Sequence, residues 1–270
     1  MMMTMLRFPS DGPRLTEAGR GIVMTMGKGG VGKTSLAVSL ATRLAVEGHR
    51  VHLTTTDPAA HIEQALGQPV KGLRVSRIDP RAETRAYADE VMETAGRDLG
   101  EPGRALLEED LRSPCTEEIA VFRAFARIVA DGTNGFVVID TAPTGHTLLL
   151  LDASEAYHRQ VSRSMNDIPD SVRQLLPRLR DPEFTKILLV TLPEATPVHE
   201  AAALQKDLRR AGIEPFAWVI NQSLTSVTVR DPVLQGRQAQ EGYYIDEVCR
   251  LSRQQFLVPW MAAPLKAAQL

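Results

Sequence analysis

The residues with the clearest chemical potential form a glycine-rich run in the first part of the chain. They fit the pattern G-x-x-x-x-G-K-[ST], in which backbone N–H groups surround nucleotide phosphates. By this pattern Lys33 binds the β- and γ-phosphates, and the hydroxyl of Thr34 binds Mg²⁺. A glycine-rich turn without a ligand is the alternative interpretation. The residues predicted to bind the nucleotide here are Gly27, Lys28, Gly29, Gly30, Val31, Gly32, Lys33, Thr34 and Ser35.

The segments on either side of this run favour the nucleotide interpretation. Residues 22–26 are apolar and predict a buried strand. An Ala/Leu-rich helix is predicted after the run, ending near Glu47 because Gly48 is a typical helix stop. The N-terminus of a helix carries partial positive charge, which stabilises bound phosphate. Strand, loop and helix therefore occur in the order that a phosphate-binding loop requires.

The second lysine of the run, Lys28, lies too early in the loop to repeat the role of Lys33. A lysine at this position can point away from its own nucleotide and reach one bound by a neighbouring chain. There it would stabilise the charge on the transferring phosphoryl group. We therefore predict that Lys28 acts across a dimer interface, with a solvated loop lysine as the alternative.

Two aspartates follow predicted strands, at the edge of the sheet where ligands of parallel α/β proteins bind. Asp140 ends the apolar strand at 136–139 and is predicted to support Mg²⁺, directly or through water. Asp57 follows the strand at 50–56 and is predicted to lie near the phosphates and the metal and to orient the attacking water. An alternative role for Asp57 is the N-cap of a helix that has Pro58 at its first position.

The remaining elements must position these groups. Helices alternate with strands, which predicts right-handed crossovers and a mostly parallel, doubly wound sheet, the α/β fold of phosphate-loop (P-loop) nucleoside triphosphatases. Residues 1–20 are expected to form a flexible arm, and residues 21–270 a single domain. A helical subdomain is predicted at about 80–130, with breaks at 100–103 and 113–114, and a helical segment at about 152–185. Further strands are predicted at 73–78, 186–192, 216–220 and 256–259, and further helices at 196–211 and 232–254.

Composition excludes several classes of function. The formal net charge of −2 provides no basic surface, so nucleic acid is not an expected partner. No apolar run approaches the ~20 residues that a membrane-spanning helix needs. The two cysteines, Cys115 and Cys249, do not make a disulfide framework, and no export signal is recognisable, so we expect a cytoplasmic protein.

Several motifs resemble known ATPases. The glycine loop, with its extra lysine, resembles the deviant Walker A loop of the class that includes nitrogenase iron protein and septum-positioning ATPases. Residues 140–147, Asp-Thr-Ala-Pro-Thr-Gly-His-Thr, resemble a signature shared by arsenical pump-driving ATPases and tail-anchored-protein targeting ATPases. Residues 113–120 and 147–153 are similar to the arsenical pump-driving ATPases, in particular to their C-terminal half. The resemblance extends from about Gly21 to Pro259.

This resemblance implies an ATPase stimulated by As(III) or Sb(III) that drives a membrane efflux protein. The protein would associate peripherally with the inner membrane through that partner. In the family, residues matching Ser113, Cys115 and His146 bind the metalloid, and thiolate suits such soft ions. A buried structural cysteine is the alternative for Cys115. The family also places Asn221 and Pro259 near the adenine base.

The family's familiar form fuses two such halves, and both supply metalloid ligands. This chain contains one half and one candidate thiol, so we expect it to pair as a homodimer or with a separate homologous half. One alternative is a chaperone-like targeting ATPase. The absence of a Cys-x-x-Cys pair, and a single methionine (Met165) in residues 153–185, argue against it. A nucleotide-switch ATPase without metalloid control is a further alternative.

Overall fold

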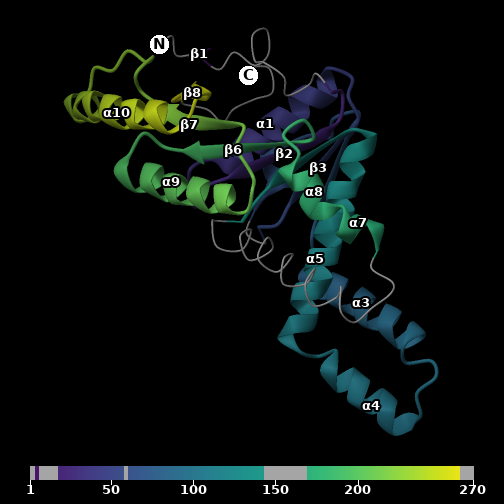
Figure 1. The fold of residues 1–270 in the computed structure, drawn as a ribbon. Coiled ribbons are helices and arrows are strands. Elements are labelled where there is room, and N and C mark those ends of the chain that lie inside the picture. Colours follow the sequence, from purple (N-terminus) through teal and green to yellow (C-terminus); the bar gives the residue numbers. More distant parts are fainter. Residues whose placement is uncertain (1–3, 6–17, 58–59, 143–168, 262–270) are drawn as a thin grey trace.

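The computed structural model describes residues 4–5, 18–57, 60–142 and 169–261 (Figure 1). Within these residues eight strands form one sheet, in which all neighbouring strands are parallel. The strand order is β1-β8-β7-β6-β2-β5-β3-β4. The strands are β1 (Thr4–Met5), β2 (Gly21–Met26), β3 (Val51–Thr55), β4 (Leu73–Arg77), β5 (Phe136–Asp140), β6 (Thr185–Thr191), β7 (Ala217–Ser223) and β8 (Gln255–Pro259). The predicted α/β fold with a parallel, doubly wound sheet is confirmed.

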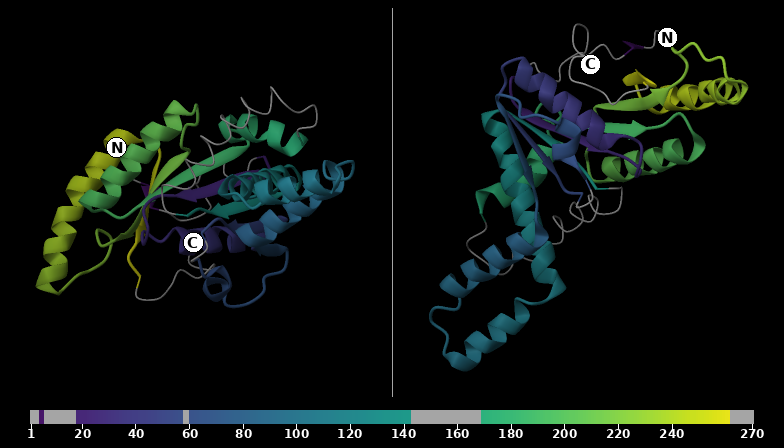
Figure 2. Two further views of the ribbon diagram at one scale, coloured as in Figure 1. Left: turned by 90° about the horizontal axis from the view of Figure 1, so that it is seen from below. Right: turned by 180° about the vertical axis from the view of Figure 1, so that it is seen from behind.

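Helices cover both faces of this sheet. On one face lie α1 (Lys33–Val46) and α2 (Ile62–Leu66). The other face packs against α5 (Pro114–Asp131), α7 (Asp170–Arg173), α8 (Leu175–Arg180), α9 (Ala195–Arg210) and α10 (Pro232–Leu251). Figures 1 and 2, which view the molecule from the front and from behind, show α9 and α1 on opposite faces.

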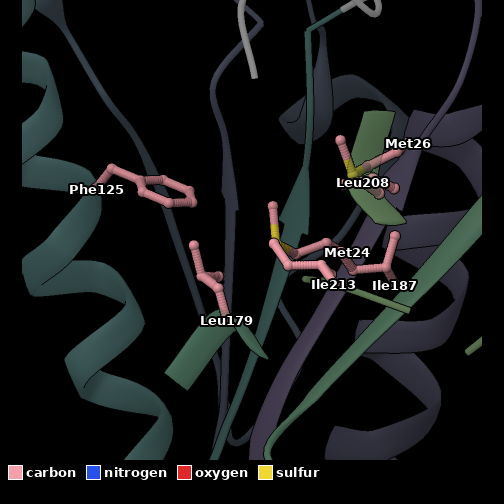
Figure 3. A pocket seen from close by; sticks show the side chains of 7 residues that line it. All are labelled: Met24, Met26, Phe125, Leu179, Ile187, Leu208 and Ile213. Atoms are coloured by element: carbon pink, nitrogen blue, oxygen red, sulfur yellow. The ribbon is translucent and has the colours of Figure 1, made fainter. Parts of the chain in front are cut away.

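Two apolar clusters hold the layers together, one on each face of the sheet. Strands such as β2 contribute to both clusters, because successive side chains of a strand point to opposite faces. In β2, Met24 and Met26 pack toward α5 and α9, whereas Val23 packs toward α1. Between β2, β6 and the helices on the first of these sides lies a gap of about 10 Å³ (Figure 3). It is lined by Met24, Met26, Phe125, Leu179, Ile187, Leu208 and Ile213. A gap of this size without polar groups is a packing irregularity and not a ligand site.

The predicted helical insertion lies between β4 and β5. It consists of α3 (Pro80–Thr94), α4 (Glu101–Asp110) and α5, followed by the 3₁₀ turn η1 (Gly132–Asn134). Figure 1 shows α3 and α4 projecting away from the sheet, with α5 connecting this projection to the sheet. Ion pairs join α5 to α3, Arg123 to Glu90 at 2.8 Å and Arg127 to Glu83 at 2.5 Å. Across the described part of the chain, no helix combines the length and apolar character needed to cross a membrane.

The structure corrects three boundaries. Part of the expected flexible arm, Thr4–Met5, is a strand that pairs with β8. Residues 101–103, where a break was expected, form the first turn of α4, which tolerates Pro102 because N–H groups there need no helical partner. The helical segment predicted at 152–185 ends at Arg180, and β6 begins at Thr185. The portion up to residue 168 lies outside the described residues.

Candidate active site

The glycine run forms a tight loop between β2 and α1, and two of its glycines are required by close contacts. Gly27 has a φ of +145°, and a Cβ atom there would lie 2.2 Å from the carbonyl oxygen of Val190. Gly32 has a φ of +92° and is the N-cap of α1. A Cβ atom on Gly32 would lie 2.2 Å from Nδ2 of Asn221. The loop is therefore packed against the ends of β6 and β7, with its backbone held at the start of a 14-residue helix.

Lys33 lies inside this loop, with only 6% of its surface exposed. Its Nζ donates a 2.9 Å hydrogen bond to the carbonyl oxygen of Lys28, so the loop holds its own ammonium group. Burial lowers the pKa of Lys33, whereas the carboxylates of Asp140 and Asp57 act in the opposite direction. An anionic ligand in the loop would add to the effect of the carboxylates and favour the charged form.

Thr34 and Asp140 meet directly beside the loop. The Thr34 hydroxyl donates a 2.7 Å hydrogen bond to Oδ2 of Asp140, and Thr25 donates to Oδ1 at 3.4 Å. Asp140 is 1% exposed. This burial raises the pKa of Asp140, while the Thr34 hydrogen bond and the Lys33 charge oppose the shift. A hydroxyl and a carboxylate are hard oxygen donors, which fits the ligand chemistry of Mg²⁺.

Asp57 lies near the same two groups. Burial has the largest effect on the pKa of Lys33 and on the pKa of Asp140. The charge of Asp57 raises both pKa values. The N–H of Asp57 donates a 3.0 Å hydrogen bond to Oγ1 of Thr55. The Thr55 hydroxyl in turn donates a 3.1 Å hydrogen bond to the carbonyl oxygen of Asp140. The helix that follows, α2, begins at Ile62 and has His61 as its N-cap, so Asp57 is not the N-cap of α2, while Pro58 lies outside the described residues.

Lys28 forms an ion pair with Glu200 of α9, with 2.9 Å between Nζ and Oε1. Both side chains remain well exposed, at 37% and 40%. The charged end of Lys28 is therefore accessible at the surface. The role of Lys28 across a dimer interface stays a prediction.

The two residues expected near the base lie at the ends of neighbouring strands. Asn221 is 4% exposed, and its Nδ2 donates a 2.9 Å hydrogen bond to the carbonyl oxygen of Val31 in the glycine loop. This strand was expected to end at Ile220 but continues through Ser223. Pro259 is half-buried at the end of β8 and is paired with Ser223 of β7. Asn221 therefore braces the loop, and its contact with a base stays a prediction.

Two of the three residues predicted to bind the metalloid lie on the helical insertion. Ser113 is the N-cap of α5, and Cys115 is exposed in the first turn of that helix. His146 lies outside the described residues. Among the residues that the structure describes, no three His, Cys, Asp or Glu side chains are grouped to hold a metal ion. Cys249 packs against the core on α10, as expected of a structural cysteine.

Some residues of the site were not predicted from the sequence. The sequence gives no signal for Glu200 as the partner of Lys28, because the two residues lie far apart in the chain. Three threonines around Asp140 were also missed. Thr25 bonds its carboxylate, Thr55 bonds its carbonyl oxygen, and the hydroxyl of Thr56 accepts from the N–H of Ala142. The run of three threonines at the end of the predicted strand, Thr54-Thr55-Thr56, was a usable signal.

Comparison with known proteins agrees with this geometry. A family model described as Anion-transporting ATPase matches residues 20–168 and 152–264. An arsenical pump-driving ATPase of Escherichia coli is 54% identical over 244 residues, which cover 90% of this chain and 42% of the relative. One from Acidiphilium multivorum is 55% identical over 234 residues, covering 87% of this chain and 40% of the relative. The ATPase GET3C of Arabidopsis thaliana is 28% identical over 256 residues, which cover 73% of this chain and 66% of the relative.

The chain thus spans about two-fifths of the length of the two bacterial relatives. The matched regions include the glycine loop, Asp57, Asp140 and Asn221. Together with the loop geometry and the Thr34–Asp140 pair, this coverage assigns the chain: it belongs to the anion-transporting ATPase family.

Proposed function

We propose that this protein hydrolyses ATP with Mg²⁺ and uses the energy to drive As(III) or Sb(III) efflux through a membrane partner. The observation that carries the catalytic part is the assembled cluster of Lys33, Thr34 and Asp140 around the glycine loop. The relatives named arsenical pump-driving ATPase support the transport part. Under this proposal the protein works in the cytoplasm, at the inner membrane.

Each residue of the cluster has a separate task. Lys33 binds the β- and γ-phosphates, and the loop N–H groups surround them. Thr34, Asp140 and, through its nearby charge, Asp57 hold Mg²⁺, which neutralises charge on the transferring phosphoryl group. Asp57 also orients the attacking water. Phosphoryl transfer depends on positioning and electrostatics, so side chains held this firmly are suited to it.

Pairing with a second ATPase half completes the site. The ammonium group of Lys28 is accessible and forms a surface ion pair with Glu200, so it can leave Glu200 and approach the nucleotide of a neighbouring half. The neighbouring half is a second copy of this chain or a separate homologous ATPase. Pairing also brings in metalloid ligands that add to Ser113, Cys115 and His146.

A targeting ATPase for hydrophobic helices is the second candidate, because relatives named GET3 match at lower identity. The higher identity to arsenical pump-driving ATPases favours efflux.

Phosphate release from ATP tests the catalytic proposal. We expect turnover with Mg²⁺, none with EDTA, and none for Lys33→Ala. Turnover should be normal for Lys71→Ala, which removes an exposed lysine from the turn before β4. Equal activity of the two variants, or no Mg²⁺ dependence, would contradict the proposal.

A further inference from the structure

A buried glutamate holds the turn that follows β7, at residues 224–227. Asn221, which is predicted to contact the base, lies at the same end of β7. Glu241 lies on α10 and is 1% exposed. Its Oε2 accepts hydrogen bonds from the Ser223 hydroxyl and from the N–H of Leu224, both at 2.8 Å. We propose that Glu241 is a positioning residue for the base of the bound nucleotide, acting through this turn. The inference rests on the proposed nucleotide site and goes beyond it.

The last residues of β7, directly before this turn, have a strained backbone. Gln222 has a φ of +57° and is, within the described part of the chain, the one residue other than glycine with a positive φ. The pairing of β7 with β8 also shifts register between Ile220 and Ser223. A residue other than glycine held in the left-handed region is strained and persists where its surroundings fix it. Strain of this kind concentrates at ligand sites.

A second side chain of α10 holds the same segment. Gln238 lies one helical turn before Glu241, on the same face of α10. Its Nε2 donates to the carbonyl oxygens of Leu224 and Val227, at 2.5 and 3.0 Å. Glu241 therefore accepts from the turn while Gln238 donates to it, and the conformation of the turn is set from α10.

Both predicted base-side residues are connected to this turn. Asn221 precedes Gln222 directly and contacts the glycine loop through Val31. On the other side, the N–H of Trp260, next to Pro259, donates to the carbonyl oxygen of Ser223 at 2.8 Å. Gln222, Leu224 and Trp260 also line a cavity of about 280 Å³. A change in the turn would therefore move the groups expected to contact the base, while the loop keeps its own contacts with β6.

A second buried polar side chain separates a role at the base from a purely structural one. Gln205 offers the structural comparison. It is 2% exposed, bonds Trp218 and the carbonyl oxygen of Leu251, and makes no bond to the turn after β7.

The test compares a ligand that has a base with one that has none. Binding of Mg-ADP and of inorganic tripolyphosphate is measured for the wild type, Glu241→Leu, Glu241→Gln and the control Gln205→Leu. The wild type is expected to bind ADP more tightly than tripolyphosphate, and the ratio of these two affinities is the gap that the variants test. Glu241→Leu should narrow that gap about tenfold, as expected for the loss of two hydrogen bonds, by weakening ADP alone. Glu241→Gln keeps an acceptor oxygen and should stay close to the wild type.

The outcomes separate the two proposals. If the wild type binds no nucleotide, the proposed function fails. If it binds ADP no better than tripolyphosphate, or if Glu241→Leu leaves the gap unchanged or weakens both ligands equally, only the role of Glu241 is overturned. Gln205→Leu should lower thermal stability and leave the gap unchanged. Should Glu241→Leu not fold, Ser223→Ala removes one of the two donors and must narrow the gap by a smaller factor, and no narrowing would overturn the role.

Discussion

The hydroxyl of Thr34 donates a 2.7 Å hydrogen bond to the buried carboxylate of Asp140, across 106 positions of sequence. The bond joins the first turn of α1 to the end of β5, so the glycine loop and the central strand meet at one pair of oxygen atoms. Both atoms suit Mg²⁺, and the pair is the structural centre of the proposed ATPase.

Removing the Thr34 hydroxyl should uncouple the loop from the metal site. For Thr34→Ala we expect the Mg²⁺ concentration at half-maximal turnover to rise about 10- to 100-fold. Thr34→Ser keeps the hydroxyl and should resemble the wild type. A magnesium titration of phosphate release measures this, and an unchanged midpoint for Thr34→Ala would remove Thr34 from the metal site.

Releasing Lys28 from Glu200 should ease its action on a neighbouring nucleotide. The pair is exposed, and such pairs contribute about 0.2–1 kcal/mol, so Glu200→Gln should raise turnover at subsaturating protein concentration by at most about fivefold. Lys28→Ala should abolish hydrolysis and spare ATP binding. Glu194→Gln, which breaks a different ion pair of the same region, with Arg237, is the matched control. A loss of turnover in Glu200→Gln would mean that Glu200 assists Lys28 instead of restraining it.

Acid should destabilise the protein partly through His52, which is 8% exposed. Burial lowers the pKa of His52, Arg74 lowers it further, and Asp131 opposes them. Because the unfolded state then binds more protons below about pH 6.5, stability is present above that pH and declines as pH falls through the folded-state pKa.

His52→Gln, which can still reach Ser76, should therefore lose less thermal stability than the wild type between pH 7 and pH 5. Melting temperatures across this range measure the effect. His61→Gln changes an exposed histidine and should follow the wild type. Parallel curves for all three proteins would rule out His52 as a source of acid sensitivity.

The fold was predictable because its signals are local. Short apolar runs ending in Asp140 or near Asn221 predict buried strands, and the glycine loop fixes where the nucleotide edge lies. Gly27 and Gly32 were recognisable as loop residues. The reasons that they must be glycine, Val190 and Asn221, come from strands more than 150 positions away. Contacts of this kind depend on strand order and register, which the motif does not contain.

Other features had no local signal at all. Glu200 and Glu241 are ordinary helical glutamates in the sequence, and packing alone brings one to Lys28 and the other to the turn after β7. The strand at Thr4–Met5 is too short for its alternation to be read. The metalloid-binding roles predicted for Ser113 and Cys115 came from family resemblance, and the position of these residues explains why. They lie at the N-terminus of α5, in an insertion that the phosphate-loop pattern does not describe.

Metalloid stimulation of ATP hydrolysis is the decisive test of the proposed efflux function. Phosphate release is measured with and without antimonite for the wild type, Cys115→Ala and Cys249→Ala, over a range of protein and ATP concentrations. We expect equal basal turnover in all three proteins, and stimulation in the wild type and Cys249→Ala but not in Cys115→Ala. A wild type that does not respond to antimonite at any ATP concentration, or a Cys115→Ala variant that responds like the wild type, would contradict the proposed function.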